Sequence, residues 1–227
     1  MTAVIPAPIR SFNRYELKYV IHASQIDSIV ADVLGQMSAD RHGDDSGSYV
    51  ISNLYYDSPG LHMLRSKIFG NNYRRKLRVR VYGDAGDQAP RTAMVEIKQR
   101  LGRTTQKRRV MVPLDEALRI CEGGSRREWD DAADRAVAEE IQGLVLALAL
   151  QPACTISYRR RAFVGSRFES GLRLTIDTEL WGAPPRLDFY TQRPTTFLMP
   201  RDWSILEIKI DDRVPSWINE LVTRHDC

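Results

Sequence analysis

Polar and apolar residues alternate with a period of two along many short stretches of the chain. In the segment YRRKLRVRVYG, residues 73–83, Lys76, Arg78 and Arg80 occupy one side and aliphatic residues the other. Successive side chains of a strand point to opposite faces, so this pattern predicts a β-strand with one cationic face. Similar alternation, or enrichment in aromatic and β-branched residues, predicts eight strands at residues 14–21, 49–57, 76–83, 93–100, 104–112, 153–164, 172–180 and 204–211.

Segments with helical spacing of apolar residues interrupt these strands. They predict helices at residues 24–37, 58–70, 114–124, 130–151 and 215–227. Ser24 and Ser58 are the expected N-caps, Gly123 and Gly124 follow the third helix, and Pro152 ends the fourth. The pattern therefore predicts a mainly β protein with flanking helices, in the α+β class.

The ionisable residues are concentrated on one side of five predicted strands. These residues are Glu16 and Lys18; Lys76, Arg78 and Arg80; Glu96 and Lys98; Arg173 and Asp177; and Glu207 and Lys209. A sandwich would turn this side toward water, and alternation alone does not exclude that arrangement. Two features favour a barrel with a charged lumen and helices packed outside. The amphipathic helices need an apolar sheet face to cover, and the charged side is rich in arginine, which binds phosphate well.

Length and composition narrow the class of protein. The 227 residues suit a single domain, expected to span 1–227 with a flexible tail at 1–13, and the net charge of +4 with a pI of 9.0 is modest. The three cysteines match no metal or redox spacing, which indicates a reducing compartment. No signal peptide is evident, and the apolar run 144–150 is too short to span a bilayer, so a cytoplasmic location is expected.

Two functional classes find little support in the residues. The four histidines show no pairing with serine or cysteine that would indicate a catalytic triad. Single-stranded nucleic-acid binding predicts exposed aromatics interleaved with arginine, whereas RKLRVRV has aliphatic residues there. No specific nucleic-acid partner is therefore expected.

Seven short motifs occur in an order that resembles the VTC domain. They are RYELKYVI, YYDSP, KLRVRVYG, VEIKQR, YRRRAF, LRLTIDTEL and ILEIKI, and the resemblance covers residues 14–220. The VTC domain is the polyphosphate polymerase branch of the triphosphate tunnel metalloenzymes. The resemblance implies a closed tunnel of eight antiparallel strands that binds ATP and a divalent metal, Mn²⁺ or Mg²⁺. The implied activity is transfer of the γ-phosphoryl group of ATP onto an inorganic polyphosphate chain.

The resemblance also implies roles for individual residues. The triphosphate-binding cations would be Lys18, Arg78, Arg80, Lys98, Arg160 and Arg173, with Lys209 on the same face as Glu207. From the run 107–109, Lys107 and Arg109 are candidates for the same site, because three consecutive residues cannot share one face. Glu207 resembles the metal ligand of the family. Glu96 and Glu16 are further metal candidates, and the alternative for each is that it neutralises Lys98 or Lys18.

Two departures from the family pattern bear on activity. Hydrolytic members begin with Glu-x-Glu-x-Lys, whereas this chain has Arg14, Glu16 and Lys18, which favours the polymerase branch. In the family a Ser-Lys-aromatic segment, whose lysine helps close the tunnel, follows the last helix. It does not occur before Cys227, so the chain is expected to be either trimmed or compromised. A tripolyphosphate or nucleoside-triphosphate hydrolase and a non-catalytic polyphosphate-binding module are the alternatives. A membrane-protein partner, with membrane association through it, is left open.

Overall fold

A computed structural model describes residues 15–40, 43, 47–83, 92–102, 104–166, 169, 171–185, 196–211 and 213–227. The strands are β1 (Tyr15–His22), β2 (Ser38–Ala39), β3 (Ser48–Asp57), β4 (Tyr73–Tyr82), β5 (Thr92–Leu101), β6 (Thr104–Pro113), β7 (Gln151–Val164), β8 (Arg173–Ala183), β9 (Thr196–Phe197) and β10 (Trp203–Ile210). The helices are α1 (Ala23–Leu34), α2 (His62–Ile68), α3 (Leu114–Ile120), α4 (Ala132–Leu148) and α5 (Ser216–Arg224). Each predicted strand and helix thus has an observed counterpart. The expected tail at 1–13 and Arg14 lie outside the described residues.

The strands join in the order β1-β10-β8-β7-β3-β4-β5-β6, with β2 paired to β7 and β9 paired to β8. Pairing is antiparallel between β1 and β10, β10 and β8, β4 and β5, and β5 and β6. The predicted mainly antiparallel sheet with helices is confirmed.

The predicted closure of this sheet into a tunnel is wrong. Within the described residues, β1 and β6 are the two ends of the strand order and are not hydrogen-bonded to each other. Closure requires the end strands to meet in a matching register, which the alternation within each strand does not specify. Cationic side chains on the edge strand β6, Lys107 to Arg109, also oppose further edge pairing.

The chain divides into two compact units. The first unit contains Ser52–Ile156, and the second contains Asn13–Ile51, Ser157–Gly182 and Arg193–Cys227. The expectation of a single domain over 1–227 therefore stays a prediction.

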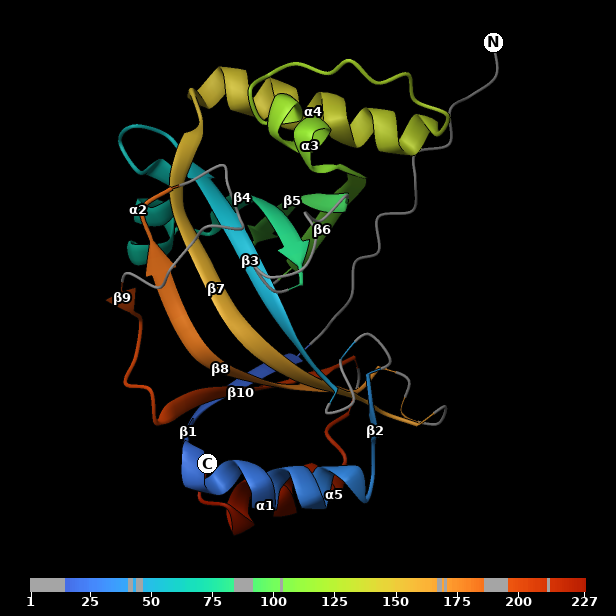
Figure 1. The fold of residues 1–227 in the computed structure, drawn as a ribbon, viewed down its shortest axis with the longest axis vertical. Helices are drawn as coiled ribbons and strands as arrows, with labels where there is room; N and C mark the ends of the chain where they lie inside the picture. The colour runs from blue at the N-terminus through green and yellow to red at the C-terminus, as the bar shows by residue number, and fades with distance from the viewer. Residues whose placement is uncertain are drawn as a thin grey trace. The chain divides into compact units, whose positions relative to one another are not determined.

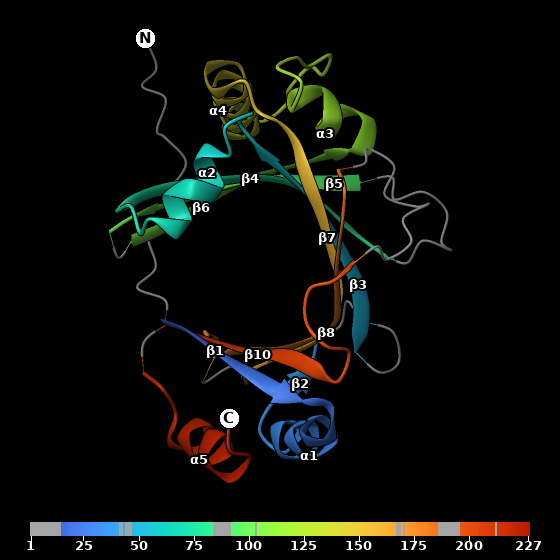
Figure 2. The same cartoon turned by 90° about the vertical axis from the view of Figure 1, so that its left-hand side faces the viewer.

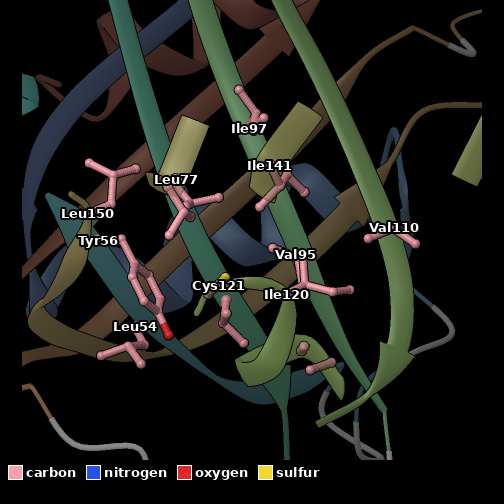
Figure 3. Close-up of a cluster of buried hydrophobic side chains, with 14 of the residues drawn as sticks. Leu54, Tyr56, Leu77, Val95, Ile97, Val110, Ile120, Cys121, Ile141 and Leu150 are labelled. Atoms are coloured by element: carbon pink, nitrogen blue, oxygen red, sulfur yellow. The ribbon is translucent and has the colours of Figure 1, made fainter. Parts of the chain in front are cut away.

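In the first unit, α3 and α4 lie side by side and cover the aliphatic face of β4, β5 and β6 (Figures 1 and 2). Leu77, Val95, Ile97 and Val110 from these strands are at most 1 % exposed and belong to one cluster with residues of both helices, including Ile141 (Figure 3). Full burial of each such side chain stabilises the fold by about 1.5–3 kcal/mol. The helices therefore direct the opposite, ionisable sides of these strands away from the apolar core.

In the second unit, α1 and α5 lie side by side next to β1 and β10 (Figures 1 and 2). Ile29 and Val33 of α1 and Ile218 of α5 pack in one buried cluster with Leu174 of β8 and Ile208 of β10. The same arrangement thus occurs twice: helices cover the aliphatic face, and the charged residues occupy the other face. This face assignment agrees with the sequence prediction for both sets of strands.

Several predicted helix boundaries shift for local reasons. The N-cap of α1 is His22 rather than Ser24, because the His22 ring accepts the Ser24 N–H and Gln25 completes a capping box. The N-cap of α4 is Asp131, whose carboxylate accepts the Ala133 N–H. The helix α4 ends at Leu148, before Pro152, because Ala149 adopts a left-handed conformation at φ 47°.

The start of α2 also differs from the prediction. Ser58 Oγ does accept the His62 N–H at 3.0 Å, but Leu61 occupies the N-cap position. The Asp57 carboxylate accepts the N–H groups of Met63 and Leu64, each at 2.9 Å. An acidic residue at the end of β3 therefore holds the first turn of α2.

Candidate functional site

The ionisable residues of the first unit form cross-strand rows on one face of β4, β5 and β6. Directly paired positions place Arg78 opposite Glu96 and Glu96 opposite Arg109. The next row contains Lys76, Lys98 and Lys107. Directly opposed residues of an antiparallel pair project to the same face, with Cβ atoms about 4.5–5.5 Å apart. The row of cations predicted on β4 therefore continues across two further strands.

One buried carboxylate organises this face. Glu96 is 2 % exposed, and its Oε2 accepts hydrogen bonds from Arg78 Nε at 2.7 Å and pairs with Arg78 Nη2 at 2.6 Å. Its Oε1 forms an ion pair with Lys107 Nζ. Arg78 Nη1 also donates to the Tyr55 hydroxyl at 3.3 Å. We call Glu96, Arg78 and Lys107 the Glu96 centre.

The Glu96 carboxyl is held ionised by these cations. Burial alone would raise its pKa, but Arg78, Lys107 and Arg80 outweigh burial and lower the pKa to about 2. Burial has the opposite consequence for Lys107, lowering the pKa of that ammonium even though Glu96 partly offsets the effect. Glu96 is therefore a permanent negative charge, and the positive charges of the neighbouring cations outnumber it.

Arg80, whose charge also lowers the pKa of Glu96, contacts further side chains. It is 7 % exposed, and its Nε donates to Asn53 Oδ1 at 2.8 Å. Asn53 in turn donates from Nδ2 to the Ile156 carbonyl at 3.0 Å, and the guanidinium lies over the Tyr82 ring at 5.8 Å. A neutral amide and an aromatic ring therefore help to fix the guanidinium.

The second unit contains a comparable carboxylate on β10. Glu207 is 6 % exposed, and its Oε1 lies 3.0 Å from Lys18 Nζ, while its Oε2 accepts a hydrogen bond from Lys209 Nζ at 2.5 Å. Arg160 Nη2 lies 3.9 Å from the same Oε2, and Lys18 also pairs with Glu16 Oε1 at 2.9 Å. We call Glu207, Glu16, Lys18 and Lys209 the Glu207 centre.

The electrostatics of this centre also favour an ionised glutamate. Burial would raise the pKa of Glu207, but hydrogen bonding with Glu16 and the charges of Lys209 and Lys18 lower it well below its usual range. Partial burial would lower the pKa of Lys18, but Glu207 and Glu16 outweigh it and raise that pKa. Burial lowers the pKa of Lys209, with Glu207 opposing the shift.

Two arginines of the second unit are fixed by acidic residues that sequence reasoning did not assign to the site. Arg160 forms a two-pronged ion pair with Asp177, at 2.6 and 2.7 Å, and its guanidinium lies over the Tyr158 ring at 5.1 Å. Arg173 Nη2 donates to Asp40 Oδ2 at 2.7 Å and to the Tyr49 hydroxyl at 3.2 Å. Asp177 lies on the same face of β8 as Arg173, so the alternation of that strand pointed to it. No sequence pattern pointed to Asp40.

The basic run on β6 divides between the two faces. Lys107 and Arg109 lie on the same side as Glu96, and Arg109 Nη1 contacts the sulfur of Met94 at 3.8 Å. Arg108 lies on the helix side, where its Nε donates to Glu140 of α4 at 2.6 Å. The run therefore contributes cations to the charged face and a link to a covering helix.

Two histidines contact serines in the structure, although the sequence indicated no histidine–serine pairing of the kind found in a triad. His22 Nδ1 lies 2.8 Å from Ser24 Oγ and His22 Nε2 lies 3.4 Å from Asp202, while His225 Nδ1 lies 3.4 Å from Ser28 Oγ and its Nε2 lies 2.9 Å from Asp32. His22 caps α1, and Gln25 Nε2 of α1 donates to the His225 carbonyl at 2.5 Å. These contacts stabilise α1 and its packing with α5, so they are explained without a hydrolytic triad.

The two carboxylates differ in how well they suit a divalent metal. Among the residues described, no group of three or more His, Cys, Asp or Glu side chains is arranged to hold a metal ion. Mg²⁺ and Mn²⁺ prefer several oxygen ligands, which one or two carboxylates and a bound phosphate chain can provide together. Glu207 has Glu16 beside it and so fits such a donor set. Glu96 is surrounded by cations, among them Arg78 and Lys107, which matches its alternative role as a neutralising anion.

Comparison with known families places these centres in context. The family model for the VTC domain matches residues 13–227. No curated protein matches the chain in sequence. No helix in the described parts of the chain is long and apolar enough to span a membrane.

Solved structures show a similar fold. A candidate adenylate cyclase from Bacillus halodurans has a TM-score of 0.50 at 11 % identity, over 94 % of this chain and 91 % of its own. The PH1819 protein from Pyrococcus horikoshii has a TM-score of 0.42 at 14 % identity, with 93 % and 86 % coverage. The HpAC1 protein from Hippeastrum, which has a dominant triphosphatase activity, has a TM-score of 0.45 at 13 % identity, with 93 % and 87 % coverage.

Proposed function

This chain belongs to the VTC domain family, and we propose that it is a metal-dependent polyphosphate polymerase. The proposed reaction transfers the γ-phosphoryl group of ATP onto an inorganic polyphosphate chain. The observation that supports it most directly is the occurrence of cation-rich strand faces on both units, each built around a buried glutamate whose pKa is lowered. Such faces suit a multiply charged phosphate ligand better than a neutral one.

Phosphoryl transfer requires little covalent chemistry from the protein, because positioning and charge stabilisation dominate the catalysis. Arg78 and Arg80 are held by Glu96 and Asn53, and Arg160 is held by Asp177. Guanidinium groups fixed in this way lose little entropy when they bind phosphate oxygens. We therefore assign these three arginines to phosphate binding, together with Lys18, Lys98, Lys107, Arg109, Arg173 and Lys209.

Glu207, assisted by Glu16, would hold the divalent cation. The metal would supply charge neutralisation at the phosphate oxygens. In the structure, Lys18 and Lys209 neutralise the Glu207 carboxylate, and the aliphatic side chains of both lysines are flexible. They can therefore move toward phosphate oxygens while Glu207 remains available as a ligand.

Incubation of the protein with ATP and Mn²⁺ tests the proposal. A polymerase produces ADP together with acid-labile, long-chain phosphate that is absent without protein. ADP accompanied only by orthophosphate would identify a triphosphate hydrolase instead. Tight polyphosphate binding without ADP formation would identify a non-catalytic binding module. A Glu207→Gln variant prepared in parallel controls for contaminating ATPases.

A further inference from the structure

Helix α2 exposes most of its apolar side chains to water. Its Met63 is buried in the core cluster of the first unit, whereas Leu64 and Ile68 are 47 % and 68 % exposed. Residues four apart on a helix share one face, so Leu64 and Ile68 form an apolar stripe on the outer side of α2. The next residue, Phe69, is 74 % exposed. The helices α3 and α4 of the same unit, by contrast, bury apolar residues in the core cluster.

The chain continues from α2 to two further exposed apolar residues, at the paired ends of β4 and β5. A short turn, with Gly70 at φ 69°, leads from α2 into β4, and α2 packs against β4 (Figure 2). Tyr73 at the start of β4 is directly paired with Leu101 at the end of β5, so both project to the same face. They are 44 % and 61 % exposed. We call Leu64, Ile68, Phe69, Tyr73 and Leu101 the α2 patch.

Cations lie next to these apolar residues along the chain. Arg65 and Lys67 belong to α2, and Arg74 and Arg75 belong to the start of β4. The sequence from Ser58 to Gly83 contains no aspartate or glutamate. Within the described parts of the chain, no ion pair joins any of these four cations to an acidic side chain. The surroundings of the patch are therefore positively charged, and their electrostatic complement is an anionic surface.

We propose that the α2 patch is a docking surface for an anionic phospholipid bilayer. Ile68 and Phe69 enter the boundary between head groups and acyl chains, while Arg65 and Lys67 contact lipid phosphates. Large apolar side chains with lysine and arginine beside them are the combination that binds membrane interfaces. Docking also removes from water a group of apolar side chains of a size that soluble monomers rarely expose together. The inference concerns where the protein is held and does not rest on the proposed polymerase activity.

The composition of the patch favours a lipid surface over a second copy of this chain. Two copies joined through the patch would bring their cations together, and like charges at short distance repel one another. An anionic bilayer attracts each cation instead, and it accepts apolar side chains without a groove of matching shape. Tyr73 adds an aromatic ring with a polar hydroxyl, a side chain that is enriched at membrane–water interfaces.

Co-sedimentation of the full chain with lipid vesicles tests the proposal. Vesicles of phosphatidylcholine alone are compared with vesicles that also contain about 30 % phosphatidylserine. The wild-type protein should bind the anionic vesicles about tenfold or more tightly than the neutral ones, and added salt should weaken that binding. Ile68→Ser/Phe69→Ser should weaken binding to the anionic vesicles about tenfold or more, because the apolar surface that enters the bilayer is lost.

A charge variant and a matched control distinguish the patch from the rest of the surface. Arg65→Gln/Lys67→Gln should weaken binding to the anionic vesicles about tenfold and leave binding to the neutral ones unchanged. Leu34→Ser/Leu146→Ser removes apolar side chains of similar exposure from the end of α1 and from α4. This control should bind both kinds of vesicle as the wild type does. All the substituted side chains are exposed, so each variant should keep the thermal unfolding of the wild type.

The variant Phe69→Trp reports entry into the bilayer directly. Its fluorescence should shift to shorter wavelength on anionic vesicles. Lipids brominated in their acyl chains should quench it more than they quench the native tryptophans of the wild type. Leu34→Trp is the corresponding control and should show no additional quenching.

Four results would overturn the inference. The first three are absence of vesicle binding, equal binding to both vesicle compositions, and undiminished binding of Ile68→Ser/Phe69→Ser to anionic vesicles. The fourth is a wild-type dimer that the same variant dissociates in sedimentation velocity, which would make the patch an interface between copies. The proposed function is tested separately, in solution without lipid. Its failure there would leave vesicle binding through the patch as expected.

Discussion

The Glu96 and Glu207 centres solve the same electrostatic problem with different side chains. Each has a glutamate that is at most 6 % exposed, on a strand whose other face is covered by helices. Glu96 is gripped by the guanidinium of Arg78 through two nitrogens, whereas Glu207 lies between the ammonium groups of Lys18 and Lys209. Glu207 also has a second carboxylate, Glu16, close by.

This difference suggests a division of labour between the centres. A planar guanidinium paired through two nitrogens is rigid, so under the proposed function Glu96 would mainly orient Arg78 toward phosphate. Lysine side chains are flexible and their ammonium groups can exchange partners, so in the same proposal Glu207 would be released to bind a metal.

The largest effect is expected from charge reversal in the Glu96 centre. Arg78→Glu should abolish tripolyphosphate binding, because it places a second carboxylate beside Glu96 and repels the ligand. Arg78→Ala should weaken binding about tenfold or more, since one charge-assisted contact contributes roughly 1.5–3 kcal/mol. Calorimetric titration measures both. Arg108→Ala, on the helix side of β6, should bind normally, and an equal loss of binding in that variant would contradict the assignment.

Substitution in the Glu207 centre should affect turnover rather than binding. Glu207→Gln keeps the shape of the side chain and removes the charge that would hold the metal, so metal-dependent turnover should fall about 100-fold or more. Polyphosphate binding should survive, because the surrounding cations remain. Glu96→Gln is the informative counterpart and should weaken binding instead. Full metal-dependent activity in Glu207→Gln would show that this residue is not the metal ligand.

In acid, the free energy of unfolding should depend on pH differently in the wild type and in Glu96→Gln. Its pKa is lowered from 4.5 to about 2, so ionised Glu96 stabilises the fold at pH values above 4.5. The linked free energy is about 3 kcal/mol and should be lost as the pH falls from about 4.5 to about 2. The difference in the free energy of unfolding between the wild type and Glu96→Gln, measured by urea denaturation, should therefore shrink as the pH falls. If this difference in unfolding free energy did not change with pH, the ion pairs of Glu96 would not be its cause.

A smaller effect is expected at alkaline pH. The pKa values of Lys107 and Lys209 lie below the ordinary 10.5 because of burial. A bound polyanion raises them, so binding takes up protons and affinity should fall as the pH rises through the lowered values. Arginine stays protonated there, so Lys107→Arg and Lys209→Arg should each flatten the profile of affinity against pH. The variant with the larger effect identifies the centre whose lysine contributes more to the pH dependence of binding. If neither variant changed the profile, the prediction would be contradicted.

Local sequence patterns are sufficient to predict the helices and strands and the two faces of each strand. The alternation in KLRVRVYG places Leu77, Val79 and Val81 on the buried side and Arg78 on the other, as observed. The same holds for Glu207 between Leu206 and Ile208. This information is local, because the period of two follows from backbone stereochemistry and the apolar face must be buried.

Which charged side chains pair with one another depends on the tertiary structure. Glu96 pairs with Arg78 and Lys107 because β4 and β6 flank β5 in that register, and Arg173 meets Asp40 although 133 residues separate them. The contact of His225 with Ser28 arises in the same way, from the packing of α1 with α5. Whether β1 and β6 pair is likewise a long-range property. Strand register and the packing of distant segments depend on the balance of the whole fold, which no local pattern encodes.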